Sequence, residues 1–112
     1  MNDLNFELFT RPSTRRPSRG ALPIVTLSEK GLWHISAEAR RLLQQPTHVQ
    51  MLYDRTRRAV GFRACESTAQ GAYRISKSGY VRAIHFCAAY NIALTNHGFE
   101  PHLEKDILVI QL

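Results

Sequence analysis

The chain has 112 residues, of which 44% are hydrophobic and 21% charged, a length and composition suited to one compact domain with one core. Its net charge of +6 and isoelectric point of about 9.9 favour polyanionic partners, DNA first among them. No apolar run reaches the roughly 18–20 residues of a membrane helix, and the start lacks the order of a signal peptide, so we expect a cytoplasmic protein without a membrane role.

The chain is expected to begin with a flexible basic arm over residues 1–20, followed by a single domain over residues 21–112. Residues 10–20 contain two prolines and no apolar side chain, so nothing in them predicts an anchor to a core. Four arginines of the arm suit contacts with the backbone or minor groove of DNA, although they would equally raise solubility. They are Arg11, Arg15, Arg16 and Arg19.

The first half of the domain, residues 24–64, predicts strands, a short helix and a hairpin. The expected elements are a strand over 24–27, a strand over 32–35, a helix over 37–43 and a hairpin over 49–64. Ser36 stands where a helix N-cap is needed, and Pro46 is placed to end the helix.

The second half, residues 73–112, repeats this order. The expected elements are strands over 73–76 and 80–84, a helix over 85–94, and strands over 99–103 and 107–112. An offset of 48 places Gly31 on Gly79. The helices align better at 49, which places Ile35 on Ile84 and implies a one-residue insertion after Gly79. We interpret the pattern as an internal duplication, against the alternative of two similar hairpins by chance.

The stretch from Val25 to Leu43 resembles the AbrB/MazE/SpoVT swapped-hairpin family. That family has a strand, a glycine turn, a second strand ending in Ile-Pro, and a helix of the form x-x-x-Arg-x-x-Leu. Gly31, Ile35, Arg40 and Leu43 fall at the corresponding spacing.

Two departures weaken this match, above all in the second half. Ser36 and His85 stand where the family has proline, and Ala89 stands where it has the helix arginine. The match therefore covers residues 24–64 well and residues 73–112 only weakly.

The resemblance implies an α+β fold in which two β-α-β-β units form one closed, pseudo-symmetric swapped-hairpin β-barrel with short helices. Two units in one chain would correspond to the arrangement of the MraZ proteins, and further association into a homodimer is compatible with the family. It also implies DNA binding by basic residues of the turns and the helix. Carried over by position, these are Lys30, Arg40, Arg41 and Lys77.

The positive charge lies mainly in the first two thirds of the sequence. Residues 1–20, 21–70 and 71–112 carry net charges of +2, +3 and +1. Arg40 and Arg41 would bind phosphates or base edges, or else form an ordinary solvated helix end. Trp33 and Tyr80 would stack on bases, or else pack into the core.

Catalytic and metal chemistry are not expected, and neither is a cofactor. The five histidines show no metal-ligand spacing, and the two cysteines form no C-x-x-C pair. Cys87 lies near His85, as a nucleophile would, but sits in an apolar stretch where a thiol usually serves as a small hydrophobe.

The sequence thus predicts a non-enzymatic protein that binds double-stranded DNA sequence-specifically as a small transcriptional regulator. The alternative is a protein-interaction module on the same fold, such as a toxin-neutralising or phage-type inhibitor protein. The weaker basic set of the second half favours this alternative, because a symmetric DNA reader needs charge on both halves.

Overall fold

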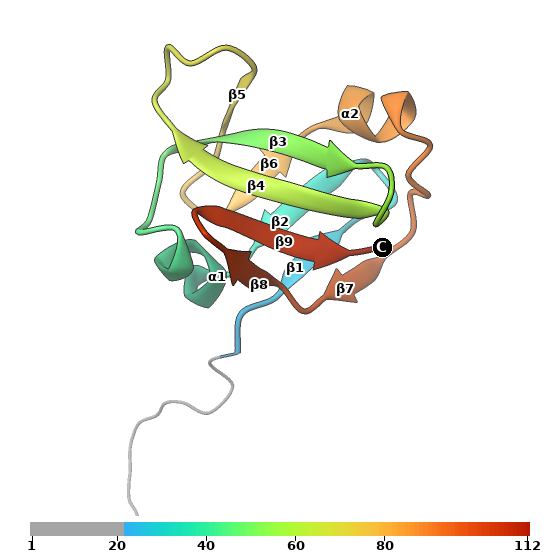
Figure 1. Cartoon of the computed structure of the whole chain (residues 1–112), viewed down its shortest axis with the longest axis horizontal. Coiled ribbons are helices and arrows are strands. Elements are labelled where there is room, and N and C mark those ends of the chain that lie inside the picture. Colours follow the sequence, from blue (N-terminus) through green and yellow to red (C-terminus); the bar gives the residue numbers. More distant parts are fainter. Residues whose placement is uncertain (1–21) are drawn as a thin grey trace, which may run out of the picture.

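The structure is a computed structural model that describes residues 22–112. It is a small α+β protein with two antiparallel sheets and two short helices in the described part (Figure 1). The elements are β1 (Val25–Leu27), β2 (Leu32–Ile35), α1 (Ala37–Leu42), β3 (His48–Asp54), β4 (Ala59–Cys65), β5 (Ala72–Arg74), β6 (Tyr80–Arg82), α2 (Ile84–Ala89), β7 (His97–Phe99), β8 (His102–Glu104) and β9 (Ile107–Gln111).

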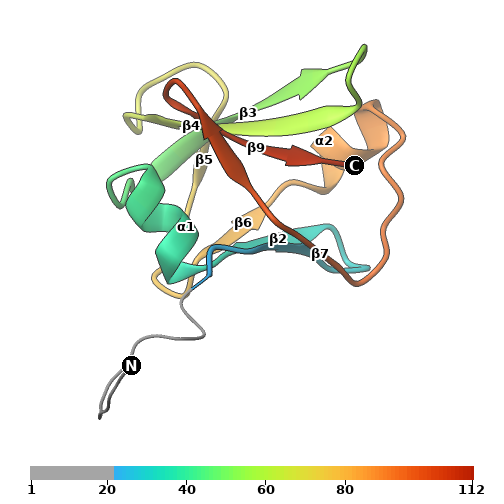
Figure 2. The same cartoon turned by 60° about the horizontal axis from the view of Figure 1, so that its bottom comes forward.

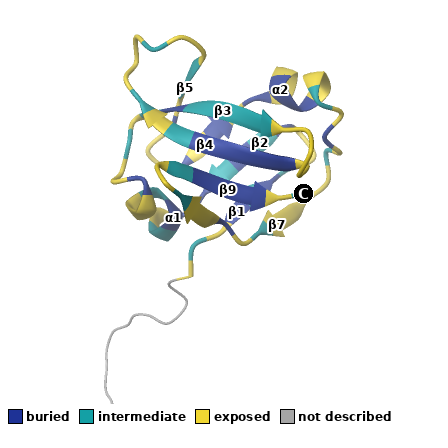
Figure 3. Cartoon of the chain, viewed as in Figure 1, coloured by how far each residue is buried: buried dark blue, intermediate teal, exposed yellow. Residues whose placement is uncertain are grey.

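The two sheets form two layers that face each other across the core. One sheet has the strand order β6-β2-β1-β7 and the other the order β5-β3-β4-β9-β8. Helices α1 and α2 lie at opposite ends of this two-layer arrangement (Figure 2). Strands β4 and β9 in the middle of the five-stranded sheet are largely buried, whereas most turns are exposed (Figure 3).

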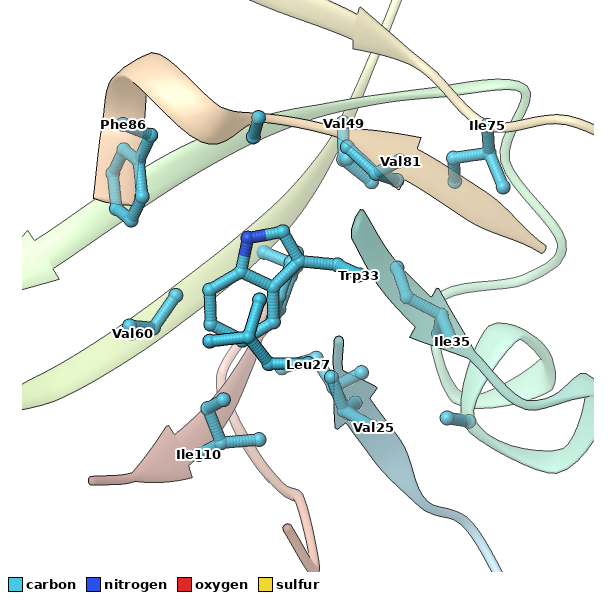
Figure 4. Close-up of a cluster of buried hydrophobic side chains, with 14 of the residues drawn as sticks. Val25, Leu27, Trp33, Ile35, Val49, Val60, Ile75, Val81, Phe86 and Ile110 are labelled. Carbon is cyan, nitrogen blue, oxygen red and sulfur yellow. The ribbon is translucent and has the colours of Figure 1, made fainter. Parts of the chain in front are cut away.

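Trp33 occupies the middle of the core, between the two sheets (Figure 4). Its ring packs edge-on against Phe62 of the opposite sheet, with 5.6 Å between ring centroids. Both side chains are fully buried, as are Val25 and Leu27, which alternate with the half-buried Thr26. Core packing, one of the two roles considered for Trp33, is therefore confirmed, and base stacking by this residue is wrong.

The expected single closed barrel does not form among the strands of residues 22–112, which instead pair into two separate sheets. The strands at the edges of the sheets are β6 and β7 in one and β5 and β8 in the other. Each of these is three residues long, so it offers few backbone groups for bridging to the opposite sheet.

Strand pairing between the two halves of the chain follows the predicted offset of 48. Trp33 pairs with Val81 at the centre of the β2–β6 ladder, and Gly61 pairs with Val109 at the centre of the β4–β9 ladder. The residues paired at the centre of each ladder are therefore 48 positions apart, as expected for an approximate two-fold axis between the halves.

The predicted insertion after Gly79 is wrong. Ile35 N donates to Gly79 O at 2.8 Å, and Ala83 N donates to Gly31 O at 3.3 Å. These two bonds are counterparts at an offset of 48, so the position equivalent to Ile35 is Ala83 rather than Ile84.

Several elements differ in length from the prediction. Ser36 caps α1 as expected, its hydroxyl accepting from Ala39 N at 3.2 Å. The second helix ends at Ala89 instead of residue 94, because the chain turns through the positive φ of Asn91. The strand expected over 99–103 is split into β7 and β8 around Pro101, which has no N–H for a ladder.

The expected arm, with Arg11, Arg15, Arg16 and Arg19, lies outside the described residues. Within residues 22–112, no helix has the length and apolar character to cross a membrane.

An ion-pair cluster joins the β3–β4 turn to β8, and it predicts a pH-dependent contribution to stability. Both terminal nitrogens of Arg57 donate to the Glu104 carboxylate, at 2.9 and 2.5 Å, and His102 Nε2 donates to the same group. The hydrogen bonds from Arg57 and then from His102 lower the pKa of Glu104 from 4.5 to about 2. The stabilisation is therefore complete above pH 4.5 and is lost as the pH falls towards 2.

Glu104→Gln should remove this pH dependence. We expect a slightly lower melting temperature than wild type at pH 6 and no difference at pH 2, the effect staying small because the pair is exposed to solvent and salt. Thermal melts of both proteins from pH 2 to pH 6 measure this, and parallel curves across that range would contradict it.

Candidate nucleic-acid interface

A basic hollow of about 690 Å³ lies between α1 and the turn that joins β5 to β6. Its cations are Arg40 from the helix, Arg74 at the end of β5 and Lys77 from the turn, and His48 of β3 lies at its wall. The remaining lining residues are Ala37, Gln45, Pro46, Thr47, Ile75 and Ser76.

A second hollow of about 400 Å³ adjoins the first. It is lined by Leu32, Arg74, Ser76, Lys77, Tyr80 and Arg82, so Arg74, Ser76 and Lys77 are common to both hollows. Neither hollow has an acidic residue among the described residues that line it. We call the cations of the two hollows, Arg40, Arg74, Lys77 and Arg82, the basic groove.

Strand alternation explains why two of these cations, Arg74 and Arg82, face outward. Ile75 and Val81 are buried, and the residues beside them, Arg74, Tyr80 and Arg82, are exposed. The turn between the strands is closed by a hydrogen bond from Gly79 N to Ser76 O at 2.9 Å. The Ser76 hydroxyl also accepts from Tyr80 N at 3.0 Å, which fixes the start of β6.

Arg40 joins the first half of the chain to this turn of the second half. Its Nε donates to Ile35 O at 3.0 Å, and its Nη1 donates to the backbone oxygen of Lys77 at 3.3 Å. No carboxylate is within ion-pair distance of Arg40 in the described part of the chain, so the neutral acceptors hold the guanidinium in place without cancelling its charge. Arg40 therefore has a structural role in addition to its contribution to the positive potential.

Of the four predicted residues that the structure describes, it brings only Arg40 and Lys77 together. Lys30 lies on the turn between β1 and β2, at the opposite end of the β2–β6 ladder from Lys77. Arg41 is outside both hollows; its side chain is 60% exposed and lies 3.4 Å from Glu38.

Arg74, Arg82 and His48 were missed from the sequence, although a signal for the first two was present. The region from residue 67 to residue 99 contains no Asp or Glu, and its only Lys and Arg residues are Arg74, Lys77 and Arg82. All three acids of the last third follow residue 99 and hide this local excess in the net charge. The net charge is larger in the first two thirds of the sequence, but three of the four cations of the basic groove come from the last third.

The equivalent surface on the other side of the approximate two-fold axis is not basic. Forty-eight positions before Arg74, Lys77 and Arg82 stand Thr26, Glu29 and His34, and Ala88 stands 48 after Arg40. Each of the four cations is thus replaced by a neutral, acidic or histidine side chain. Among residues 22–112, the basic groove therefore has no basic counterpart at the equivalent positions.

The described residues do not include a cluster of three or more His, Cys, Asp or Glu side chains suited to a metal ion. Cys87 is buried, and burial raises the pKa of its thiol more than the neighbouring Trp33 indole lowers it. Its thiol is therefore a poor nucleophile at neutral pH.

No protein-family model, curated protein or solved structure matches this chain.

Proposed function

We propose that this protein binds double-stranded DNA through the basic groove, as a small regulator of transcription. The observation that carries the proposal is the gathering of Arg40, Arg74, Lys77 and Arg82 over two adjoining hollows that no acidic residue lines. Phosphate contacts of this kind supply most of the affinity of DNA-binding proteins and position them on the duplex. Arg41 and Lys30 lie outside both hollows, so they contribute only to the wider positive field.

We further propose that the two halves are diverged swapped-hairpin units of the AbrB/MazE/SpoVT type. The resemblance of residues 25–43 and the pairing of positions 48 apart in two ladders support this arrangement. Strand β1 pairs with β7, and β3 pairs with β5, so each half also completes the sheet of the other.

Because the positive charge lies on one side of the fold, we propose a specific stoichiometry of DNA binding. A symmetric reader would present the same cations twice, whereas this chain presents one basic groove. One chain would therefore occupy one half-site, and a palindromic operator would require two chains, that is, a homodimer.

The salt dependence of duplex binding tests the proposed function. Three to four phosphate contacts predict a slope of log K against log salt of about −3 to −4. Arg74→Ala combined with Lys77→Ala should reduce its magnitude by about 2 and weaken binding. The matched control, Lys30→Ala with Arg55→Ala, removes the same charge from the β1–β2 and β3–β4 turns and should leave the slope almost unchanged.

Fluorescence anisotropy of a labelled duplex at roughly 50 to 200 mM salt measures this slope. A flat profile for the wild-type chain would contradict DNA binding. Equal losses in the two double variants would contradict the groove as its location.

A protein-interaction role, the second candidate, is favoured by one observation. Leu42 and Leu103 are 40% and 44% exposed, and together with Leu43 and Ala64 they line a separate hollow of about 270 Å³. Exposed leucines gathered in this way are more typical of a contact surface than of a polar protein exterior. This hollow does not share a residue with the basic groove, so the two candidate functions can be tested separately.

A further inference from the structure

We infer that Tyr80 and the cations beside it form a binding site for an unpaired nucleobase and its phosphate, in a single-stranded segment of nucleic acid. The inference deepens the proposed function and rests on it, because the site is the part of the basic groove that lies along β6. It goes beyond phosphate binding, since it implies that this end of the groove prefers single-stranded to double-stranded nucleic acid.

The first support is the exposure of Tyr80. Its side chain is 43% exposed, although it lies in a strand whose central residue, Val81, is fully buried. Tyr80 pairs across the ladder with His34, and their rings are 4.6 Å apart at an angle of 50°. The exposed ring of Tyr80, on the outer side of the sheet, provides an apolar face of the type on which bases stack.

The second support is that His34 is held in place. Its Nε2 lies 2.8 Å from the backbone oxygen of Ser78, which can only accept, so Nε2 carries the proton and donates. The ring that backs Tyr80 is therefore tied to the β5–β6 turn. Less side-chain freedom then remains to be lost when a base binds against Tyr80.

The third support is the composition of the hollow that Tyr80 lines. Leu32 and Tyr80 supply apolar surface, while Arg74, Lys77 and Arg82 supply three positive charges. Apolar surface for a base beside cations for a phosphate is the combination that a nucleotide requires. The volume of about 400 Å³ is within the range of roughly 300–1,000 Å³ for small-molecule sites.

The geometry of the nucleic acid decides which strand fits. In a duplex each base is stacked on both faces and paired at its edge, so its ring faces cannot reach a tyrosine on a sheet surface. An unpaired base can leave the stack and lie against the ring. We therefore expect the duplex to use the groove cations alone, whereas a single strand uses the cations and Tyr80 together.

Fluorescence anisotropy with three labelled probes of equal length tests this inference: a single-stranded DNA, the same backbone with abasic sites throughout, and a duplex. Tyr80→Ala should weaken single-strand binding about tenfold or more, in keeping with the loss of base–aromatic stacking. It should leave duplex binding within about twofold, because phosphate contacts remain. Tyr80→Phe keeps the ring and should bind the single strand within about twofold of wild type.

Three results would overturn the inference: equal single-strand affinities of wild type and Tyr80→Ala, equal affinities of wild type for the normal and abasic strands, or a Tyr80→Ala loss that is the same for duplex and single strand. If adenosine monophosphate binds saturably and as tightly as the single strand, the site binds free nucleotides, and the inference that a single strand occupies it is wrong. Failure of wild type to bind the duplex bears on the proposed function instead. Unchanged melting temperatures of both variants exclude unfolding as the cause.

Discussion

Gly79→Ala should destabilise the fold by about 3 kcal/mol or more, a large effect for one added methyl group. Gly79 has a φ of +92°, a backbone conformation that costs an L-residue roughly 1–2 kcal/mol. A Cβ there would also lie 2.4 Å from the backbone oxygen of Ile35 and 3.1 Å from Nε of Arg40. The substitution therefore strains the turn and pushes apart the contacts that join it to β2 and α1.

Gly71→Ala is the matched control for this prediction. Gly71 also has a positive φ, +75°, but a Cβ there would have no neighbouring atom within 4 Å. It should cost only the conformational strain of roughly 1–2 kcal/mol. Urea unfolding of both variants measures the difference, and similar losses would show that the contact between the β5–β6 turn and the first half is not tight.

Phe62→Ala should cost about 3–5 kcal/mol, the usual range for truncating a fully buried aromatic ring. Phe62 is fully buried at the centre of the five-stranded sheet and packs edge-on against Trp33 of the other sheet. Its removal takes away apolar burial and leaves a cavity at an aromatic contact between the two layers.

Leu103→Ala provides the comparison for the core variant. Leu103 is 44% exposed on an edge strand, so its truncation should change stability by no more than about 0.5 kcal/mol. Chemical unfolding monitored by the fluorescence of Trp33 reports both variants. A loss below about 1 kcal/mol for Phe62→Ala would contradict a core shared by the two sheets.

Local patterns predicted the first half of the fold well, because its signals are near each other in the sequence. The hairpin of residues 49–64 is formed by two seven-residue strands, and Ser36 both precedes the helix and caps it. The second half was harder. Its helix ends where Asn91 adopts a positive φ, and its long strand is interrupted at Pro101, and neither break stood out in an otherwise helical or extended pattern.

The separation into two sheets could not be predicted from periodicity. Alternation shows which side of a strand faces the core, but it does not show which strands pair at the edges. In this chain β1 pairs with β7, more than 70 residues later, and the choice between a barrel and two layers depends on such distant pairs.

The candidate site was predicted in part, for the same reason. Arg40 and Lys77 were recognised one by one from a resemblance, but their contact spans 37 positions and requires the second turn to dock on the first helix. Arg74 and Arg82 become neighbours of Lys77 only when β5 and β6 lie on either side of that turn. The net charge of a long segment does not show these two arginines, whereas the absence of acidic residues over 67–99 does.

Together these features give the two halves different tasks within one fold. The first half supplies α1 and Arg40, and the second supplies the β5–β6 turn and the other cations of the basic groove. On the equivalent opposite side, Glu29 stands in place of Lys77 and Ala88 in place of Arg40, which leaves that side without a comparable positive surface.

Backbone amide NMR shifts during titration with a short DNA duplex at about 100 mM salt show whether DNA binds in the basic groove. We expect saturable shifts in α1 and in residues 74–82, with little change at Lys30 and the β1–β2 turn. Shifts centred on the β1–β2 turn, or no shifts at that salt concentration, would contradict it.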